Sequence, residues 1–339
     1  MKKALLVICI LSIILVAGCT QPQTINAEST SSNENADLQP DKLESSDEFS
    51  LRYSDILKKV FGNQDGEIKA VNGISVDSRG RIFISDSLNN RISVFNQDFT
   101  FDNKIGVVSG NGKNQFKGPV DAYLSDSGLL YVADSQNSRI QIYDSSLLAY
   151  RDTIGEGYGL GQYNFKTPSD IFVDSKGYIY VADTGNNRIM IYNPDRIYVT
   201  TIGKGMGSGN SQFKGPSGVA VDKGGRVYVA DSENNRIQIF SPDYLYYNTI
   251  GGEFGSDNDQ FKGPQDVFID HKNRIYVADM NGNRIQVFDP SGNYIYTLGG
   301  TAGSGNDQFS GPANIFIRGT KLYVGDHGNN RLQIFDIIN

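Results

Sequence analysis

Short apolar runs alternate with turn residues along most of the chain, and the runs recur in a fixed order. Residues 180–192 read YVADTGNNRIMIY, and nearly the same phrase returns as YVADSENNRIQIF, YVADMNGNRIQVF and YVADSQNSRIQIY. Each phrase joins two runs rich in β-branched and aromatic residues, which is typical of β-strands. The pattern predicts many short strands and no long helices.

The aspartate of this phrase marks a sequence repeat. Its six copies are Asp86, Asp134, Asp183, Asp231, Asp279 and Asp326, with spacings of 48, 49, 48, 48 and 47 residues. Each unit contains four apolar runs separated by turns, which is the pattern of a propeller blade. A four-stranded sheet has two apolar faces that it cannot bury alone, so the blades must stack around an axis. The sequence predicts an all-β, six-bladed β-propeller over residues 49–339.

The last repeat unit contains only three strand-like runs before Asn339. Residues 55–62, DILKKVFG, align with the fourth runs of later units and have no three runs of their own before them. We expect this N-terminal segment to supply the fourth strand of the last blade. Closing the ring in this way removes the exposed sheet edges.

The repeat also resembles a known family. Residues 215–240, GPSGVAVDKGGRVYVADSENNRIQIF, are similar to the NHL repeat, and the resemblance covers about residues 50–339. It implies a six-bladed propeller of NHL type. It leaves function open, because the family includes RNA-binding domains, extracellular sensor domains and a peptide-amidating lyase. WD40 and kelch propellers fit less well, because the chain has no Trp and the Asp-x-x-Asn-x-Arg pattern belongs to neither.

The Asp-x-x-Asn-x-Arg pattern has a structural explanation. Aspartate at the end of a strand can accept turn N–H groups, asparagine tolerates the left-handed turn conformation, and the guanidinium needs an acceptor. We expect each Arg to pair with an Asp of the same or the neighbouring turn. Six equivalent pairs favour a role in folding, because a catalytic centre needs one asymmetric place.

The N-terminus resembles a lipoprotein signal peptide. Lys2 and Lys3 precede an apolar run that meets Cys19 within the lipobox-like sequence LVAGC. This predicts a signal peptide over residues 1–18, lipidation of Cys19 and a flexible acidic tether to residue 48, since residues 20–48 are polar and carry seven acids against one base. The alternative is an uncleaved membrane anchor. Either places the propeller outside the cytoplasm, and the exported part has no thiol pair, since Cys9 lies within the signal.

The charge of the chain argues against nucleic acid as a partner. The formal net charge is −7, and binding to phosphates needs a clustered basic face. We therefore expect a partner that is a protein, a peptide or a glycan, bound by a monomer.

One candidate site lies where each inner strand begins, two residues after the position usually held by Pro. Its residues are Gly73, Asp121, Asp170, Gly218, Asp266 and Asn314. They should surround the mouth of the central channel, where three carboxylates and an amide could bind calcium or another divalent cation. The alternative is that each Asp caps the start of its own strand. No other cofactor is expected.

A second candidate site is a column of residues that each precede a Gly in the loops before the inner strands. The column is Asp65, Ser109, Tyr158, Met206, Phe254 and Ala302. The large side chains of Tyr158, Met206 and Phe254 predict an apolar binding patch; alternatively, they fold down over the seams between blades. From Phe61 to Val71 the first loop also looks shorter than the others, which predicts a notch over the first blade.

Enzymatic residues are scarce in the sequence. The chain has two histidines, His271 and His327, which alignment places on opposite faces, and no nucleophile has an evident base beside it. The sequence therefore favours a lipid-anchored, extracytoplasmic binding or scaffold module over an enzyme. The alternative is a divalent-cation-dependent hydrolase or lyase, similar to the lactonases, with its site at the channel mouth.

Overall fold

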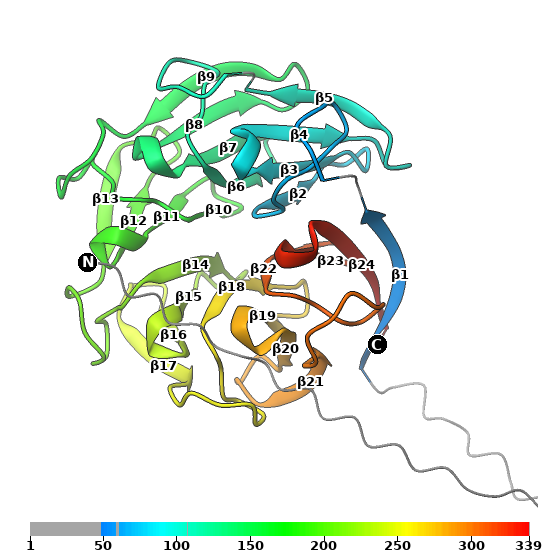
Figure 1. The fold of residues 1–339 in the computed structure, drawn as a ribbon. Helices are drawn as coiled ribbons and strands as arrows, with labels where there is room; N and C mark the ends of the chain where they lie inside the picture. Colours follow the sequence, from blue (N-terminus) through cyan, green and yellow to red (C-terminus); the bar gives the residue numbers. More distant parts are fainter. Residues whose placement is uncertain (1–48, 59–60, 107, 339) are drawn as a thin grey trace, which may run out of the picture. The chain divides into compact units, whose positions relative to one another are not determined.

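The strands of the computed structural model form six antiparallel sheets of four strands each. The structure describes residues 49–58, 61–106 and 108–338. The innermost strands β2, β6, β10, β14, β18 and β22 surround the centre of a ring, and the fourth strands lie at its periphery (Figure 1). The all-β, six-bladed propeller is confirmed.

The blades are numbered in chain order. Blade 1 contains β2 (Ile74–Val76), β3 (Ile82–Asp86), β4 (Arg91–Phe95) and β5 (Phe101–Ile105). Blade 2 contains β6 (Pro119–Leu124), β7 (Leu129–Asp134), β8 (Arg139–Asp144) and β9 (Ala149–Ile154). Blade 3 contains β10 (Asp170–Val173), β11 (Ile179–Asp183), β12 (Arg188–Tyr192) and β13 (Tyr198–Ile202).

The second half of the ring repeats this order. Blade 4 contains β14 (Pro216–Val221), β15 (Val227–Asp231), β16 (Arg236–Phe240) and β17 (Tyr246–Gly251). Blade 5 contains β18 (Pro264–Ile269), β19 (Ile275–Asp279), β20 (Arg284–Phe288) and β21 (Tyr294–Gly299). Blade 6 contains β22 (Pro312–Arg318), β23 (Lys321–Asp326), β24 (Arg331–Ile338) and, from the start of the chain, β1 (Ser50–Lys58).

One turn of 3₁₀ helix joins the second strand of each blade to the third. These helices are η1 (Ser87–Asn89), η2 (Ser135–Asn137), η3 (Thr184–Asn186), η4 (Ser232–Asn234), η5 (Met280–Gly282) and η6 (His327–Asn329). The residue after each helix has a left-handed backbone, as the Asn-rich turn predicts; Asn235 has φ 53°. Among the described residues, no helix is long and apolar enough to cross a membrane.

The hydrophobic core lies between the blades. Each buried cluster combines residues of two neighbouring sheets; one joins Tyr180 and Ile191 of blade 3 with Val219 and Val229 of blade 4. Blade stacking therefore buries the sheet faces, as the repeat requires.

An N-terminal strand closes the ring, as predicted, but it starts earlier in the chain than expected. β1 pairs antiparallel with β24, with Leu57 opposite Leu332, and it ends at Lys58 instead of continuing to residue 62. Figure 1 shows blue β1 beside red β24. The earlier end of β1 changes the alignment of the loop that follows it.

The predicted notch over the first blade is wrong. Phe61 bridges Ile68 in the first loop just as Ser109 bridges Phe116 in the second, and both pairs are seven residues apart. The first loop therefore has the same length as the second. The error arose from aligning the Gly after Phe61 with the Gly that ends the outer strands.

Candidate functional site

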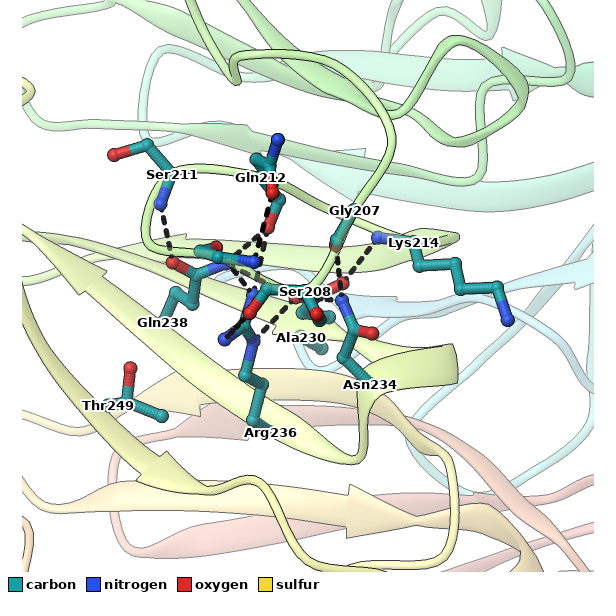
Figure 2. A network of polar contacts seen from close by, with 12 residues as sticks. Gly207, Ser208, Ser211, Gln212, Lys214, Ala230, Asn234, Arg236, Gln238 and Thr249 are labelled. Atoms are coloured by element: carbon teal, nitrogen blue, oxygen red, sulfur yellow. Dashed lines mark hydrogen bonds and ion pairs between the residues drawn. The ribbon is translucent and has the colours of Figure 1, made fainter.

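The loops that enter the inner strands are held by the arginine of the repeat. In blade 4, Arg236 donates from Nε to Asp231 Oδ2 at 2.7 Å. Its Nη1 donates to the carbonyl of Ser208 at 2.8 Å, and its Nη2 to the carbonyls of Gly209 and Gln212, both at 2.9 Å. Figure 2 shows these contacts converging from the strand onto the loop. One side chain thus fixes three loop carbonyls.

The aspartate of the repeat is the centre of the same network. Asp231 is fully buried, and its Oδ1 accepts the N–H of Lys214 at 2.7 Å. Asn234 donates from Nδ2 both to Asp231 at 2.8 Å and to the carbonyl of Gly207 at 2.9 Å. The predicted Asp–Arg pair within one turn is confirmed in all six units. The Nε–Oδ2 distances are 3.0, 2.8, 2.7, 2.7, 2.9 and 2.6 Å in chain order.

The predicted patch residues lie on these clamped loops and point into solvent. Tyr158 is 72% exposed, Met206 66% and Phe254 71%. Their backbones bridge to phenylalanines seven residues on, such as Phe165, that are fully buried. The buried phenylalanine therefore fills the seam between blades, and the alternative role of Tyr158, Met206 and Phe254 as seam covers is wrong.

The first member of the predicted column needs correction. The bridge that Tyr158 makes with Phe165 is made in the first loop by Phe61, so Phe61 belongs to the column and Asp65 does not. Phe61 is 61% exposed. Asp65 instead pairs with Lys104 and lies 3.8 Å from a guanidinium nitrogen of Arg91. Large exposed apolar side chains thus occupy four of the six equivalent positions.

The predicted ring of oxygen-bearing residues does surround the channel, where it joins neighbouring blades. In four blades the ring side chain accepts a backbone N–H from the inner strand of the next blade. The bonds run from Ile171 to Asp121 (3.1 Å), from Val219 to Asp170 (2.6 Å), from Ile315 to Asp266 (2.8 Å) and from Ile74 to Asn314 (2.9 Å). Each bond ties one blade to the next.

The two glycines of the ring are required by close approach. A Cβ on Gly73 would lie 2.5 Å from Cα of Asp121, and a Cβ on Gly218 would lie 2.8 Å from Cα of Asp266. In blade 5, Asp266 Oδ1 accepts the N–H of the next residue, Val267, at 2.7 Å. Asp266 therefore caps its own strand, which was the alternative considered for the ring residues, and its Oδ2 also accepts the bond from blade 6.

Burial makes these carboxyls weak acids. Burial raises the pKa of Asp121 to about 7 and that of Asp266 to about 8, against an ordinary 3.8. Burial, followed by the neighbouring charges of Asp121 and Asp266, also raises the pKa of Asp170 well above its ordinary value. A hydrogen bond links the Asp121 and Asp170 side chains. The pair is therefore expected to share a proton near neutral pH.

The same ring is the predicted cation site. Its oxygens already accept backbone N–H groups, and the adjoining cavity of about 100 Å³ is lined by Ser169, Ser217 and Gln265 as well as by ring residues. Among the described residues, no group of three or more His, Cys, Asp or Glu side chains is arranged to hold a metal. Cation binding stays a prediction.

Sequence reasoning missed a cavity with a volume of about 600 Å³. It lies at the carboxyl ends of the inner strands, opposite the clamped loops, and the turns between first and second strands form its rim. Tyr123, Phe172 and Phe268 line its inner end. These residues stand two positions after the ring residues, so the alternation of each inner strand is the sequence signal that could have found them.

The two histidines lie on opposite faces, as alignment predicts. His271 lines the large cavity, whereas His327 begins η6 on the side of the clamped loops. A shared metal site between them is therefore excluded by the topology of the blade.

Comparison with known families decides the repeat type. A profile of the NHL repeat matches residues 116–143, 165–192 and 213–240. The chain contains NHL repeats. A family described as a 6-bladed beta-propeller matches residues 256–338, which extends the assignment to the last blades. None of the curated proteins matches the sequence.

Solved structures share the fold of this NHL propeller at low sequence identity. A protein of unknown function from Bacteroides thetaiotaomicron superposes with a TM-score of 0.67 and 15% identity, covering 86% of this chain and 76% of that one. A virginiamycin B lyase from Staphylococcus aureus gives 0.55 and 16%, covering 86% and 100%. A gluconolactonase from Xanthomonas campestris gives 0.59 and 14%, covering 85% and 94%. At these identities the likeness is one of fold.

The NHL propeller thus brings the predicted site residues together in two places. Tyr158, Met206 and Phe254 lie on successive loops of one face, and the ring residues surround the channel beneath those loops. Cys19, the predicted lipidation site, lies outside the described residues.

Proposed function

We propose that the propeller is a binding module that recognises a protein partner through the loop face containing Tyr158, Met206 and Phe254. The single observation that supports it most strongly is the exposure of these three side chains at equivalent positions of adjacent blades. Neither folding nor the repeat explains that exposure, since Ser109 and Ala302 fill the same position in other blades. Large exposed apolar groups in one area are typical of interaction surfaces.

The rigidity of the loops supports the same proposal. Each loop that presents a patch residue is fixed by an arginine of the repeat, as Arg236 fixes the loop of Met206. A pre-organised surface loses less conformational entropy on binding than a mobile one. Aromatic and Met side chains are also the types enriched at the cores of protein interfaces.

The charges around the patch favour a protein over a polyanion. Lys166 lies over the ring of Tyr158 and Lys262 over the ring of Phe254, both at 5.9 Å from the ring centroid. Acidic residues such as Glu156 and Glu253 lie on the same loops. Such a mixed rim around an apolar centre resembles the organisation of protein interfaces.

The proposal places the propeller on the outer side of a membrane, held by a lipid on Cys19. Its support is the lipobox-like LVAGC sequence followed by an acidic, polar stretch to residue 48. A tether of that composition would allow the loop face to reach partners away from the lipid surface. Peptide and glycan ligands are the other occupants that a binding assay must distinguish.

A triple variant tests the binding proposal. Tyr158→Ser, Met206→Ser and Phe254→Ser together remove the apolar patch, whereas Leu147→Ser, Ile197→Ser and Leu245→Ser remove similarly exposed groups from turns at the opposite face. Cross-linked partners should be lost from the first variant and retained by the second, with the Tm of both close to that of the wild type. Identical partners for both variants, or a large fall in Tm of the patch variant alone, would contradict the proposal.

A hydrolase or lyase is the second candidate function, and the channel ring is the observation that favours it. Asp121, Asp170 and Asp266 are buried carboxyls with raised pKa values, a property shared by many catalytic acids. Two of the similar structures are a lyase and a gluconolactonase. The adjoining cavity of about 100 Å³ is, however, small for an organic substrate.

Calcium titration tests this second candidate. A divalent cation at Asp121, Asp170, Asp266 and Asn314 should give calorimetric heat and raise the Tm, and Asp266→Asn should abolish both effects. The absence of heat and of a Tm shift at millimolar calcium would remove the site and the cation-dependent enzyme together.

A further inference from the structure

The cavity of about 600 Å³ opposite the loop face has the features of a separate small-molecule site. We propose that it binds a small zwitterion with an apolar or aromatic body, the class that contains free amino acids and dipeptides. The site shares no residue with the patch of Tyr158, Met206 and Phe254, so it does not depend on the function proposed for that patch.

The inner end of the cavity is an aromatic floor. Tyr123 and Phe172 pack with ring centroids 5.1 Å apart, and Phe268 packs on Phe316 at 5.5 Å. Tyr123, Phe172 and Phe268 are only half-buried and line the cavity together with Val221. An apolar body placed there would remove these ring faces from water.

The floor is aromatic on two sides because of the pattern of the inner strands. The positions equivalent to Tyr123 are occupied by Ser75 in blade 1 and Ala220 in blade 4, and these two blades are opposite each other in the propeller. Aromatic residues fill blades 2, 3, 5 and 6. Ser75 and Ala220 add no ring to the floor, so its aromatic surface comes from the two pairs Tyr123–Phe172 and Phe268–Phe316.

Two carboxylates on the rim have no ion pair within the part of the chain that the structure describes. Asp126 and Asp174 belong to the turns of blades 2 and 3, and neither forms an ion pair with a described residue; Asp174 Oδ1 accepts the backbone N–H groups of Lys176 and Tyr178, both at 2.9 Å. The corresponding Asp222 in blade 4 is paired with Arg226 at 2.6 Å. In blade 3 the residue four positions after Asp174 is Tyr178 instead of arginine. Two carboxylates without an ion pair among the described residues therefore lie beside the blade 2 and blade 3 part of the floor.

The electrostatics of Tyr123 agree with this placement. Burial raises the pKa of Tyr123, and the charges of Asp126, Asp121, Asp170 and Asp174 raise it further. The negative potential thus reaches the aromatic floor itself. An ammonium group would be stabilised there by the carboxylates and by the ring faces.

The rim also has two lysines, in the turns of blades 3 and 4. Lys176 follows Asp174 in the turn of blade 3, and Lys223 lies in the turn of blade 4. Lys223 donates from Nζ to the backbone carbonyl of His271 at 3.3 Å, a neutral acceptor that leaves its charge uncompensated. Both signs of charge therefore lie on the rim, in the turns of blades 2 to 4, and together they match a ligand with an ammonium and a carboxylate.

Calorimetry on the folded propeller with four probes tests the proposed ligand class. The dipeptide phenylalanylglycine has both charges and an aromatic body; phenethylamine lacks the carboxylate, 3-phenylpropanoate lacks the ammonium, and maltose is a neutral glycan. The dipeptide should bind at least about tenfold more tightly than any of the other three. Equal or tighter binding of any of those three probes, or no binding of the dipeptide at millimolar concentration, would overturn the proposal.

Charge-removing variants locate the site. The pair Asp126→Asn with Asp174→Asn, and the pair Lys176→Gln with Lys223→Gln, should each weaken dipeptide binding by about tenfold or more. The control pair Glu156→Gln with Lys166→Gln removes one charge of each sign from the loop face and should leave binding unchanged. Unchanged binding by the rim variants, or an equal loss in the control, would overturn the assignment. The probe ranking on the wild-type protein decides the proposal even if a rim variant fails to fold.

Discussion

The side-chain amide of Asn314 donates to Asp266 Oδ2 across 3.0 Å, and Asp170 faces Asp121 at the equivalent place half-way round the channel. The ring therefore has two similar halves, Gly73–Asp121–Asp170 and Gly218–Asp266–Asn314. In the second half the amide of Asn314 supplies the donor for the hydrogen bond to Asp266. In the first half, Asp121 or Asp170 must retain a proton to form the equivalent hydrogen bond between their side chains.

This relationship predicts that stability falls as pH rises. The folded-state pKa values of Asp121 and Asp266, about 7 and about 8, lie above the ordinary 3.8. The folded state then holds more protons than the unfolded state. The stabilisation by these protonated carboxyls is therefore complete below about pH 4 and is lost as pH rises through 7 to 8. The Tm should fall by several degrees over this range.

Asp170→Asn tests the assignment to the ring. An asparagine there can accept the N–H of Val219 and donate to Asp121, which is the arrangement that Asn314 already adopts. The variant should fold, and its Tm should decline less steeply above about pH 6, because one buried carboxyl has been removed. Thermal melts of both proteins at matched ionic strength measure this. Superimposable pH profiles would show that Asp170 does not titrate in the folded state.

Arg236→Ala should cost about 3 to 5 kcal/mol of unfolding free energy, because it leaves Asp231 fully buried and without its ion pair. It also frees the loop carbonyls of Ser208, Gly209 and Gln212. The matched surface control is Arg151→Ala, whose pair with Asp144 is solvent-exposed and should contribute little to the unfolding free energy. Urea denaturation measures both. A similarly small loss in the two variants would refute the structural role of the repeat pair.

Deleting residues 1–48 should leave the Tm nearly unchanged, whereas deleting residues 1–59 should lower it strongly and promote aggregation. The second deletion removes β1, which pairs with β24 and buries Leu51 and Leu57. Loss of that strand exposes both a sheet edge and apolar surface. Thermal melts and light scattering compare the two truncations. Equal stability would mean that closure by β1 is dispensable.

Cys19→Ala should abolish incorporation of a labelled fatty acid and leave an unprocessed precursor, since the lipobox-like LVAGC sequence is the basis for the proposed anchor. Metabolic labelling followed by mass spectrometry of the N-terminus measures both effects. The thiol of Cys9 serves as the control, because Cys9→Ala lies upstream of the proposed cleavage site and should have no effect. Labelling that persists in Cys19→Ala would refute lipidation at this residue.

The repeat made most of the fold predictable. The nearly equal spacing of the six aspartates from Asp86 to Asp326 implies similar blades, and a blade with two apolar faces has few stable arrangements. The bounds of the closing strand were missed because β1 lacks the Ile-Gly or Leu-Gly ending of the other outer strands, and Phe61-Gly62 resembles that ending four residues later. The loop alignment and the place of Asp65 failed for the same reason.

The candidate sites were predictable only where one position repeats. Spacing alone places Asp121, Asp170 and Asp266 in one ring, but their hydrogen bonds to the next blade depend on how closely the inner strands approach. The large cavity was missed for a related reason. Its rim comes from five blades whose turns differ in sequence, with Asp126, Asp174, Lys223 and His271 in neighbouring turns, so no repeated motif marks it.

Photo-crosslinking tests the central claim, that the loop face binds a protein, most directly. A photoreactive phenylalanine analogue at Phe254 should form a discrete covalent adduct with a protein partner in cells, and adding Tyr158→Ser with Met206→Ser should abolish that adduct. The same analogue at Leu245, exposed in a turn at the opposite face, should form none. An adduct from position 245 but not from position 254, or no adduct from either position, would contradict the account.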